Sequence, residues 1–309
     1  MPPYKILLTG ATGFVGGHVI KQLKEDYSLY AISSKKTDIE HITKTFSWNE
    51  IESIEETFEA VIHMAGLAHD TQNNKDESVY FDVNVGLTKT LLENMKRWNC
   101  GQFIYISSVK AAVDSTSIEV LNEDFTSACT NVYGRSKLTA ERLILDSTAN
   151  INRVILRPVM IYGPGQKGNL NTLEKLIHKG VWFPFKNWQN KRSVLSINNL
   201  TFTIKEILNK KIASGVYYIA DDAAVSTVEI LESISSGINR KVRFVSIPNS
   251  IIRVGLKLLP KRLKSFTNKV LGSLEVDNSK LKTALGISTM PYNAATDLPC
   301  AFKKSSGNA

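Results

Sequence analysis

A glycine-rich turn, Thr9 to Gly16, constrains the fold of this chain more than any other feature. It directly follows an apolar run, Ile6 to Leu8, that predicts a buried strand, and it opens an amphipathic segment, 14–24, that predicts a helix. Glycines at such a junction permit a tight turn and a close approach of the backbone to a ligand, and the helix N-terminus attracts phosphate. We therefore predict a dinucleotide site whose pyrophosphate contacts are Gly10, Thr12, Gly13, Phe14, Val15 and Gly16.

The chain up to about residue 165 alternates apolar strands with helices. Apolar runs at 29–32, 60–64, 103–106 and 154–156 predict further strands, and residues 75–98 and 131–147 predict helices. This alternation predicts an α/β fold with a doubly wound parallel sheet that is covered on both faces. Because turn residues cluster from Gly163 onward, we expect a cofactor-binding Rossmann domain over 1–165 and a smaller α/β substrate region over 166–309, interleaved with it.

Composition excludes several classes of protein. The chain is 43% hydrophobic and 22% charged, as a globular protein is, and no apolar run reaches the ~18–20 residues of a membrane-spanning helix. The first residues lack the apolar core and cleavage site of a signal peptide, so we expect a cytoplasmic protein. The 3 cysteines and 5 histidines lack the paired spacing of metal ligands, and we predict no metal.

The net charge of +9 is unevenly distributed. Residues 241–270 contain eight Lys or Arg and no Asp or Glu, interleaved with Ile, Val and Leu. Such a basic amphipathic stretch has three interpretations: a solvated helix of a small domain, a peripheral contact with a membrane surface, or a surface for anionic substrate or nucleic acid. Nucleic acid is the least favoured partner, because no aromatic pattern suited to base stacking accompanies the charges.

The end of the second predicted strand bears on the choice of cofactor. An acidic residue there would bind the adenosine 2'-hydroxyl of NAD(H), but Ser33, Ser34, Lys35 and Lys36 stand in its place. Hydroxyl groups and cations suit a 2'-phosphate, so we expect NADP(H), with NAD(H) as the alternative. The alternative is that Lys35 and Lys36 are only solvated loop residues with no part in cofactor binding.

A serine and a Tyr–Lys pair follow the predicted strand at 103–106. Ser108 comes just after it, and Tyr133 and Lys137 lie one turn apart on one face of the next predicted helix. A tyrosine exchanges protons poorly near neutral pH because its ordinary pKa is about 10. A lysine cation about 5 Å away would lower that pKa by roughly two units. The pattern predicts proton exchange with a substrate oxygen that Ser108 holds by a hydrogen bond.

Taken together, these motifs resemble the short-chain dehydrogenase/reductase superfamily, in its extended branch of nucleotide-sugar epimerases, dehydratases and reductases. The resemblance covers about residues 4–286 and includes the segments 63–66, 156–158 and 161–165. It implies Tyr133 as the general acid/base, Lys137 at the nicotinamide ribose and Ser108 at the substrate oxygen. It also implies cofactor contacts from Ala65, Gly66, Asn84 and Pro158, and a homodimer. The alternatives are that Asn84 faces solvent and that Pro158 only ends a strand.

The same resemblance implies a UDP-sugar substrate, contacted by Ser108, Lys110, Asn169 and Arg192. An arginine binds diphosphate oxygens bidentately, although a surface ion pair would also explain Arg192. The aromatic segment 181–185 would line the base pocket or belong to the core. Sugar 4,6-dehydratases carry an Asp-Glu pair directly after the catalytic Ser or Thr, whereas Val109 and Lys110 follow Ser108, which disfavours a dehydratase.

Two reactions remain in this branch. Val109-Lys110 and the segment 271–277 are similar to bacterial UDP-4-keto-6-deoxy-N-acetylhexosamine 4-reductases of surface polysaccharide biosynthesis. We expect such a 4-keto reductase, because it consumes NADPH and the second strand lacks the acid typical of NAD(H) binding. A UDP-hexose 4-epimerase, which keeps its NAD, is the alternative. A non-catalytic cofactor-binding assembly or regulatory protein is a remote one, since such relatives typically lose the tyrosine or lysine.

Overall fold

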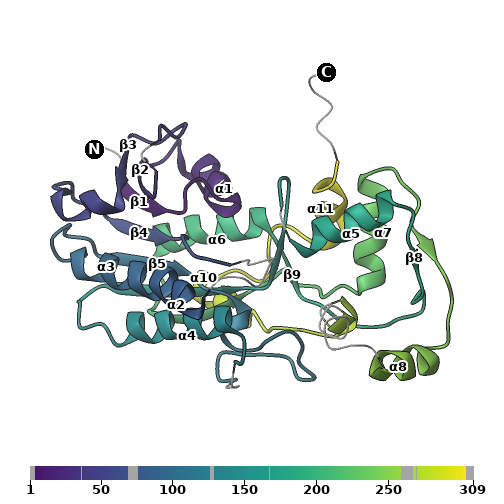
Figure 1. The fold of residues 1–309 in the computed structure, drawn as a ribbon. Helices are drawn as coiled ribbons and strands as arrows, with labels where there is room; N and C mark the ends of the chain where they lie inside the picture. The colour runs from purple at the N-terminus through teal and green to yellow at the C-terminus, as the bar shows by residue number, and fades with distance from the viewer. Residues whose placement is uncertain are drawn as a thin grey trace.

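The centre of the fold is a parallel sheet. The structure, a computed structural model, describes residues 4–35, 37–68, 76–125, 129–166, 168–258, 267–268 and 270–303. Within these residues seven strands form one sheet in the order β10-β6-β5-β4-β1-β2-β3, and each neighbouring pair is parallel (Figure 1). The strands are β1 (Lys5–Thr9), β2 (Ser28–Ser33), β3 (Lys44–Ser47), β4 (Ala60–His63), β5 (Gln102–Ile106), β6 (Asn152–Pro158) and β10 (Gly215–Ile219).

Helices cover both faces of this sheet because its strands are apolar on both sides. In β1, Ile6 and Leu8 belong to one core cluster and Leu7 belongs to the other. The first cluster includes side chains of α1 (Phe14–Leu23), α6 (Ile197–Lys210) and α10 (Ser279–Leu285), and the second includes those of α3 (Leu87–Asn94) and α4 (Val132–Leu145). The predicted doubly wound Rossmann sheet is confirmed.

The strand order reverses direction at β1. From β1 the chain continues outward through β2 and β3, then crosses back to β4 on the other side of β1 and continues through β5 and β6. In an open parallel sheet a ligand crevice forms at such a switch point, beyond the carboxyl ends of the strands. The glycine turn after β1 and the segments after β4 and β5 therefore meet at one edge.

The remaining elements form a second layer with its own core. Its strands are β7 (Met160–Tyr162), which pairs with β9 (Val194–Ser196), and β8 (Trp182–Phe183), which pairs with β11 (Arg243–Phe244). Its helices are α5 (Asn169–His178), α7 (Thr227–Gly237), α8 (Asn249–Leu258) and α11 (Ala294–Cys300). Phe183 and Phe185 are buried in this third core cluster, so for them the core alternative is the correct one.

Three features differ from the simple alternation that the sequence predicts. The strand β3, and β10 from the C-terminal half, extend the sheet at its two edges. The helix expected over 75–98 consists of α2 (Glu77–Phe81), a π-helical turn η2 (Asp82–Gly86) and α3. Short 3-10 helices, η1 (Trp48–Ser53) and η3 (Val109–Ala111), follow β3 and β5. The proposed boundary at residue 165 stays a prediction.

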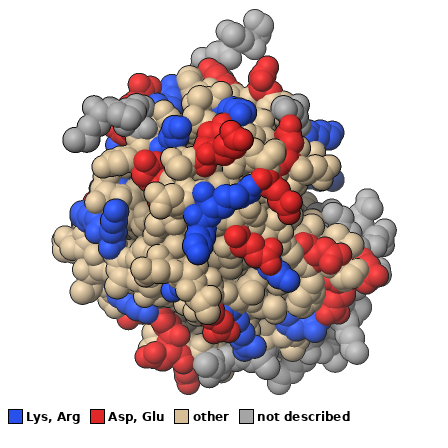
Figure 2. Space-filling model, turned by 90° about the vertical axis from the view of Figure 1, so that its left-hand side faces the viewer, with Lys and Arg blue, Asp and Glu red and all other residues tan. Residues whose placement is uncertain are grey.

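The surface of the N-terminal half carries charges of both signs. Figure 2 shows this end of the molecule, where acidic and basic side chains are interspersed. None of the helices in the described part of the chain has the length and apolar character needed to cross a membrane. The expected cytoplasmic location and homodimer stay predictions.

Candidate active site

The turn after β1 is built so closely that two of its positions accept only glycine. Gly10 has a φ of 74°, and a Cβ there would lie 2.7 Å from the backbone nitrogen of Ala65. A Cβ on Gly16 would lie 2.2 Å from the carbonyl oxygen of Gly10. Helix α1 then starts with no side-chain cap and no acidic residue in its first turn, so its first N–H groups point unblocked toward the crevice. The glycine turn and the N-terminus of α1 are therefore suited to bind the phosphates of a dinucleotide.

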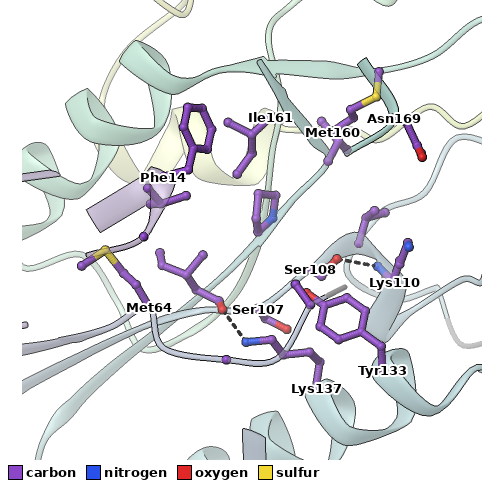
Figure 3. Close-up of a pocket in the computed structure, with 18 of the residues that line it drawn as sticks. Phe14, Met64, Ser107, Ser108, Lys110, Tyr133, Lys137, Met160, Ile161 and Asn169 are labelled. Carbon is purple, nitrogen blue, oxygen red and sulfur yellow. Dashed lines mark hydrogen bonds between the residues drawn. The ribbon is translucent and has the colours of Figure 1, made fainter. Parts of the chain in front are cut away.

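A cavity of about 390 Å³ opens beside this turn at the edge of the sheet. It brings together most of the residues singled out in the sequence: Gly10, Gly13, Phe14, Val15, Gly16, Gly66, Ser108, Lys110, Tyr133, Lys137, Pro158, Asn169 and Arg192. Figure 3 shows Phe14 and Ile161 on one side of the cavity, with Ser108, Tyr133 and Lys137 facing them. Segments far apart in the chain thus meet around one space.

Some predicted cofactor contacts do not line this cavity: Thr12, Ser33, Ser34, Lys35, Ala65 and Asn84. Ser33 ends β2, one residue beyond the Thr9–Ile32 pair, and therefore lies at the level of the glycine turn. Ser34 and Lys35 are exposed. Lys36 lies outside the described residues. The position of Ser33 and Ser34 fits an adenosine ribose bound beside the turn.

The helix that carries Tyr133 and Lys137 is fixed at its start by Asp114. Asn131 caps α4 by accepting a hydrogen bond from the backbone N–H of Gly134 at 2.7 Å. The Asp114 carboxylate in turn accepts hydrogen bonds from the backbone N–H and side chain of Asn131, and from Thr130. Burial raises the pKa of Asp114, but these hydrogen bonds outweigh it and the pKa is lowered. Asp114 therefore ties the segment after Ser108 to the helix of Tyr133.

Asp114, which also lines the cavity, was missed by the sequence analysis. Met64, Ala68, Ser115, Met160, Ile161, Leu170 and Leu274 line it as well. The only local signal for Asp114 was Asn131, a typical helix N-cap residue two positions before Tyr133. The contact between Asp114 and Asn131 spans 17 residues of sequence and could not be read from spacing.

The protonation of the Tyr–Lys pair differs from the sequence expectation. Burial raises the pKa of Tyr133 to about 12, against a hydrogen bond from Ser108 that lowers it. Burial also lowers the pKa of Lys137 to about 7, against the charge of Glu141 that raises it. The expected lowering of the tyrosine pKa by a lysine cation is therefore wrong for the protein without cofactor. Desolvation favours the neutral form of both groups.

Lys137 is held in place by the strand end. Its Nζ donates to the carbonyl oxygen of Ile106 at 2.9 Å, a hydrogen bond drawn as a dashed line in Figure 3. The same Nζ lies 4.5 Å from the centre of the Tyr105 ring. A Cβ on Gly66 would lie 3.1 Å from this Nζ, so the absence of a side chain at Gly66 leaves room for the ammonium group at the cavity.

A buried hydrogen-bond chain through His63 positions the loop after β4. The backbone N–H of Ala65 donates to Thr9 Oγ1, and Thr9 Oγ1 lies 2.6 Å from His63 Nδ1. On the other side of the ring, Nε2 lies 3.0 Å from Thr88 Oγ1, which itself donates to the carbonyl of Asn84. Every proton in this hydrogen-bond network has an acceptor when His63 is neutral with its proton on Nε2. Burial, together with the charge of Lys137, lowers the pKa of His63 well below its ordinary value.

Asn84 is buried, so the alternative that it faces solvent is wrong. It lies in the π-helical turn η2. Its side-chain oxygen accepts a hydrogen bond from the N–H of Leu67, and its side-chain nitrogen donates to the carbonyl oxygen of Leu67 and, at 2.8 Å, to Ser136 Oγ. Its side chain thus joins the loop after β4 to helix α4. A contact of Asn84 with the cofactor stays a prediction, whereas the structure shows it as a positioning residue for that loop.

A buried ion pair supports the strand ends beneath Ser108. Arg157 on β6 donates to Glu141 on α4, with Nη2 2.6 Å from Oε2, and both side chains are almost fully enclosed. Ser107 Oγ also donates to Glu141. Because Pro158 follows Arg157 directly, this pair fixes the cavity wall formed by β6 as well as the end of β5.

Arg192 closes the far side of the cavity without an acidic partner. Its Nη1 donates to the carbonyl oxygen of Gly272 at 2.7 Å, and burial lowers its pKa. Among the described residues no Asp or Glu pairs with Arg192, so these residues hold no surface ion pair of the kind considered for it. Asn169, the first residue of α5, lines the same side. A partly buried cation without a counter-ion among the described residues fits an anionic ligand group.

Comparisons with known proteins agree with this geometry. The family model described as "NAD dependent epimerase/dehydratase family" matches residues 6–229. A UDP-glucose 4-epimerase of Vibrio cholerae is 30% identical over 298 residues, covering 92% of this chain and 90% of the relative. Two crystal structures share the fold: a UDP-glucuronic acid 4-epimerase from Bacillus cereus in complex with NAD (TM-score 0.74, 20% identity, 96% of each chain) and RMD from Pseudomonas aeruginosa with NADPH (TM-score 0.72, 19% identity, 97% and 98%).

Proposed function

Because this chain belongs to the NAD-dependent epimerase/dehydratase family and is one of its sugar-nucleotide enzymes, we propose that it reduces the C4 ketone of a UDP-4-keto-6-deoxy-N-acetylhexosamine with NADPH. The observation that carries the proposal is the meeting of Ser108, Tyr133 and Lys137 in the same cavity as the glycine turn. We propose that this reduction serves the synthesis of a surface polysaccharide.

The bound cofactor supplies the hydride, and the residues of the chain handle the proton. Tyr133 donates a proton to the oxygen at C4, and its raised pKa keeps the phenol protonated at neutral pH, which is the form that reduction needs. Ser108, which hydrogen-bonds Tyr133, holds the same substrate oxygen in line. Lys137 would hold the nicotinamide ribose. In its protonated form it would return a proton to the Tyr133 phenolate and regain one from solvent, which a pKa of about 7 allows near neutral pH.

The preference for NADPH rests on the end of β2. Neither Ser33 nor Ser34 repels a 2'-phosphate, and the exposed Lys35 adds a positive charge nearby. NAD(H), the cofactor of one structural neighbour, is the alternative that binding measurements must address.

We assign the diphosphate of the substrate to the far side of the cavity. Arg192 offers a partly buried guanidinium without an acidic partner among the described residues. Lys110, with its Nζ 5.7 Å from the centre of the Tyr133 ring, adds a second cation near the sugar. Asn169 offers its amide at the start of α5. With the diphosphate on that side, the sugar would lie between it and Tyr133.

The direct test is a reductase assay with UDP-4-keto-6-deoxy-GlcNAc. We expect loss of the dihydronicotinamide absorbance band with NADPH, and one molecule of reduced sugar nucleotide for each NADPH consumed. Tyr133→Phe should lower turnover by about 100-fold or more while NADPH binding persists. Tyr27→Phe, which alters a tyrosine outside the cavity, is the matched control and should leave turnover unchanged.

A second candidate, a UDP-hexose 4-epimerase, is favoured by the name of the Vibrio cholerae relative. An epimerase converts UDP-hexoses without net consumption of cofactor. Interconversion of UDP-glucose and UDP-galactose, with no NADPH oxidation on the 4-keto sugar, would replace the reductase proposal by the epimerase. Mass spectrometry of the native protein gives an independent readout, because an epimerase should retain NAD through purification.

A further inference from the structure

The end of the molecule formed by β8, β11 and α8 exposes an unusual set of apolar side chains. Trp182 on β8 is 59% exposed, and Ile251 and Val254 on α8 are 60% and 59% exposed. Val181 and Val245, next to β8 and β11, are exposed as well. Figure 1 shows these elements together at the end of the molecule opposite β3. We call these five side chains, with the exposed Lys241 and Arg243, the β8–α8 surface.

The amphipathic character of α8 explains why its apolar side chains are exposed. Ile252, like Phe244, packs against the third core cluster, which includes Phe183. Ile251 and Val254, three residues apart, point away from that core. The helix is therefore attached by one face and presents a second apolar face outward. Large apolar side chains gathered on an open surface indicate a binding surface.

The described part of this surface carries two exposed cations, Lys241 and Arg243. Residues 241–270 contain eight Lys or Arg and no Asp or Glu, and the side chains of the other six lie outside the described residues. Residues 175–205, which include β8, also contain no Asp or Glu. The guanidinium of Arg243 lies 5.7 Å from the centre of the Trp182 ring, so cation and aromatic ring are presented together. The opposite end of the molecule, in contrast, mixes both signs of charge (Figure 2).

We infer that the β8–α8 surface docks on an anionic phospholipid bilayer. A bilayer surface offers negative headgroups and, a few ångströms deeper, an apolar layer, which matches cations interleaved with Trp, Ile and Val. Nucleic acid offers negative charge but no apolar layer for Ile251 and Val254. None of these residues lines the catalytic cavity, so docking leaves the cavity residues in place. The inference does not depend on which sugar the enzyme reduces or epimerises.

Vesicle co-sedimentation tests the inference on the full chain. Wild-type protein should sediment with vesicles of phosphatidylcholine and phosphatidylglycerol, but not with phosphatidylcholine alone, and high salt should weaken the binding. Lys241→Gln with Arg243→Gln should weaken binding by about 30-fold, because each cation near an anionic leaflet contributes about a factor of five. Ile251→Ser with Val254→Ser should weaken it by about tenfold or more.

Matched variants on other surfaces control for general effects. Ile118→Ser with Val120→Ser removes two apolar side chains that are 106% and 56% exposed elsewhere, and Lys21→Gln with Lys96→Gln removes two exposed cations. Both controls should bind vesicles as wild type does. Thermal unfolding must show that every variant is folded. A blue shift of tryptophan emission on adding anionic vesicles should disappear in Trp182→Phe, which locates the contact.

Several results would overturn the inference. The inference fails if the wild type does not sediment with anionic vesicles at low salt, or if it binds phosphatidylcholine vesicles as well as the anionic ones. It also fails if the control variants lose as much binding as the variants of the β8–α8 surface. Binding to heparin without binding to vesicles would also refute it, and would assign the surface to a soluble polyanion instead.

Discussion

Lys137→Met should change the pH dependence of stability in a direction that burial alone dictates. Lys137 is 3% exposed, and burial lowers its pKa from 10.5 in the unfolded chain to about 7 in the folded protein. Between these two values the unfolded chain binds more protons, so the folded protein gains stability as the pH rises. Below pH 7 the destabilisation by this lysine is fully present, and it is lost progressively up to the pKa of the unfolded chain.

The size of the effect follows from the shift. Relative to the Met variant, the wild type should gain about 3 kcal/mol in free energy of unfolding between pH 6 and pH 9, because each pH unit between the two pKa values contributes about 1.4 kcal/mol. Methionine matches the length of the lysine stem and removes the charge. The variant also loses the hydrogen bond to Ile106, but that loss does not vary with pH.

Urea unfolding of both proteins at several pH values between 6 and 9 measures this difference. Lys96→Met, which alters an exposed lysine, is the control, and its difference from wild type should be small and constant. A constant difference for Lys137→Met would refute the reasoning, since it would mean that the buried ammonium keeps its ordinary pKa. The proposal that Lys137 gives up and regains a proton near neutral pH would then lose its physical basis.

Three further predictions concern the surroundings of the cavity. Glu141→Ala should destabilise the protein by about 3–5 kcal/mol in urea unfolding, because Arg157 would remain buried and unpaired; adding Arg157→Met should recover part of the loss. Gly66→Ala should lower turnover without a comparable fall in melting temperature, because its Cβ would press on Lys137 Nζ and Asn84 Oδ1, whereas Gly17→Ala, with open space around it, should be neutral in both assays. Ser34→Asp should weaken NADP(H) binding at least about tenfold relative to NAD(H) in equilibrium titrations, and an unchanged ratio would remove this residue from the adenosine site.

The sequence alone was enough to predict the sheet, the turn and the shared helix face of Tyr133 and Lys137, because each depends on residues close together in the chain. A strand, three glycines and a helix within a few residues predicted the turn after β1, and a spacing of four predicted that Tyr133 and Lys137 share a helix face. Apolar runs alternating with helices predicted the parallel sheet. The edge strands β3 and β10 were missed because their place in the sheet depends on distant pairing partners.

Only the tertiary structure decided how the site is supported and charged. Asn84 in a π-helical turn binds Leu67 and Ser136, Asp114 binds Asn131 at the cavity edge, and Arg192 is partly buried with no carboxylate partner among the described residues. These facts depend on which distant residues become neighbours. The pKa values of Tyr133 and Lys137 also depend on these distant neighbours, because desolvation is a property of the assembled interior. Its effect outweighs the attraction between lysine cation and tyrosinate that the sequence spacing suggests.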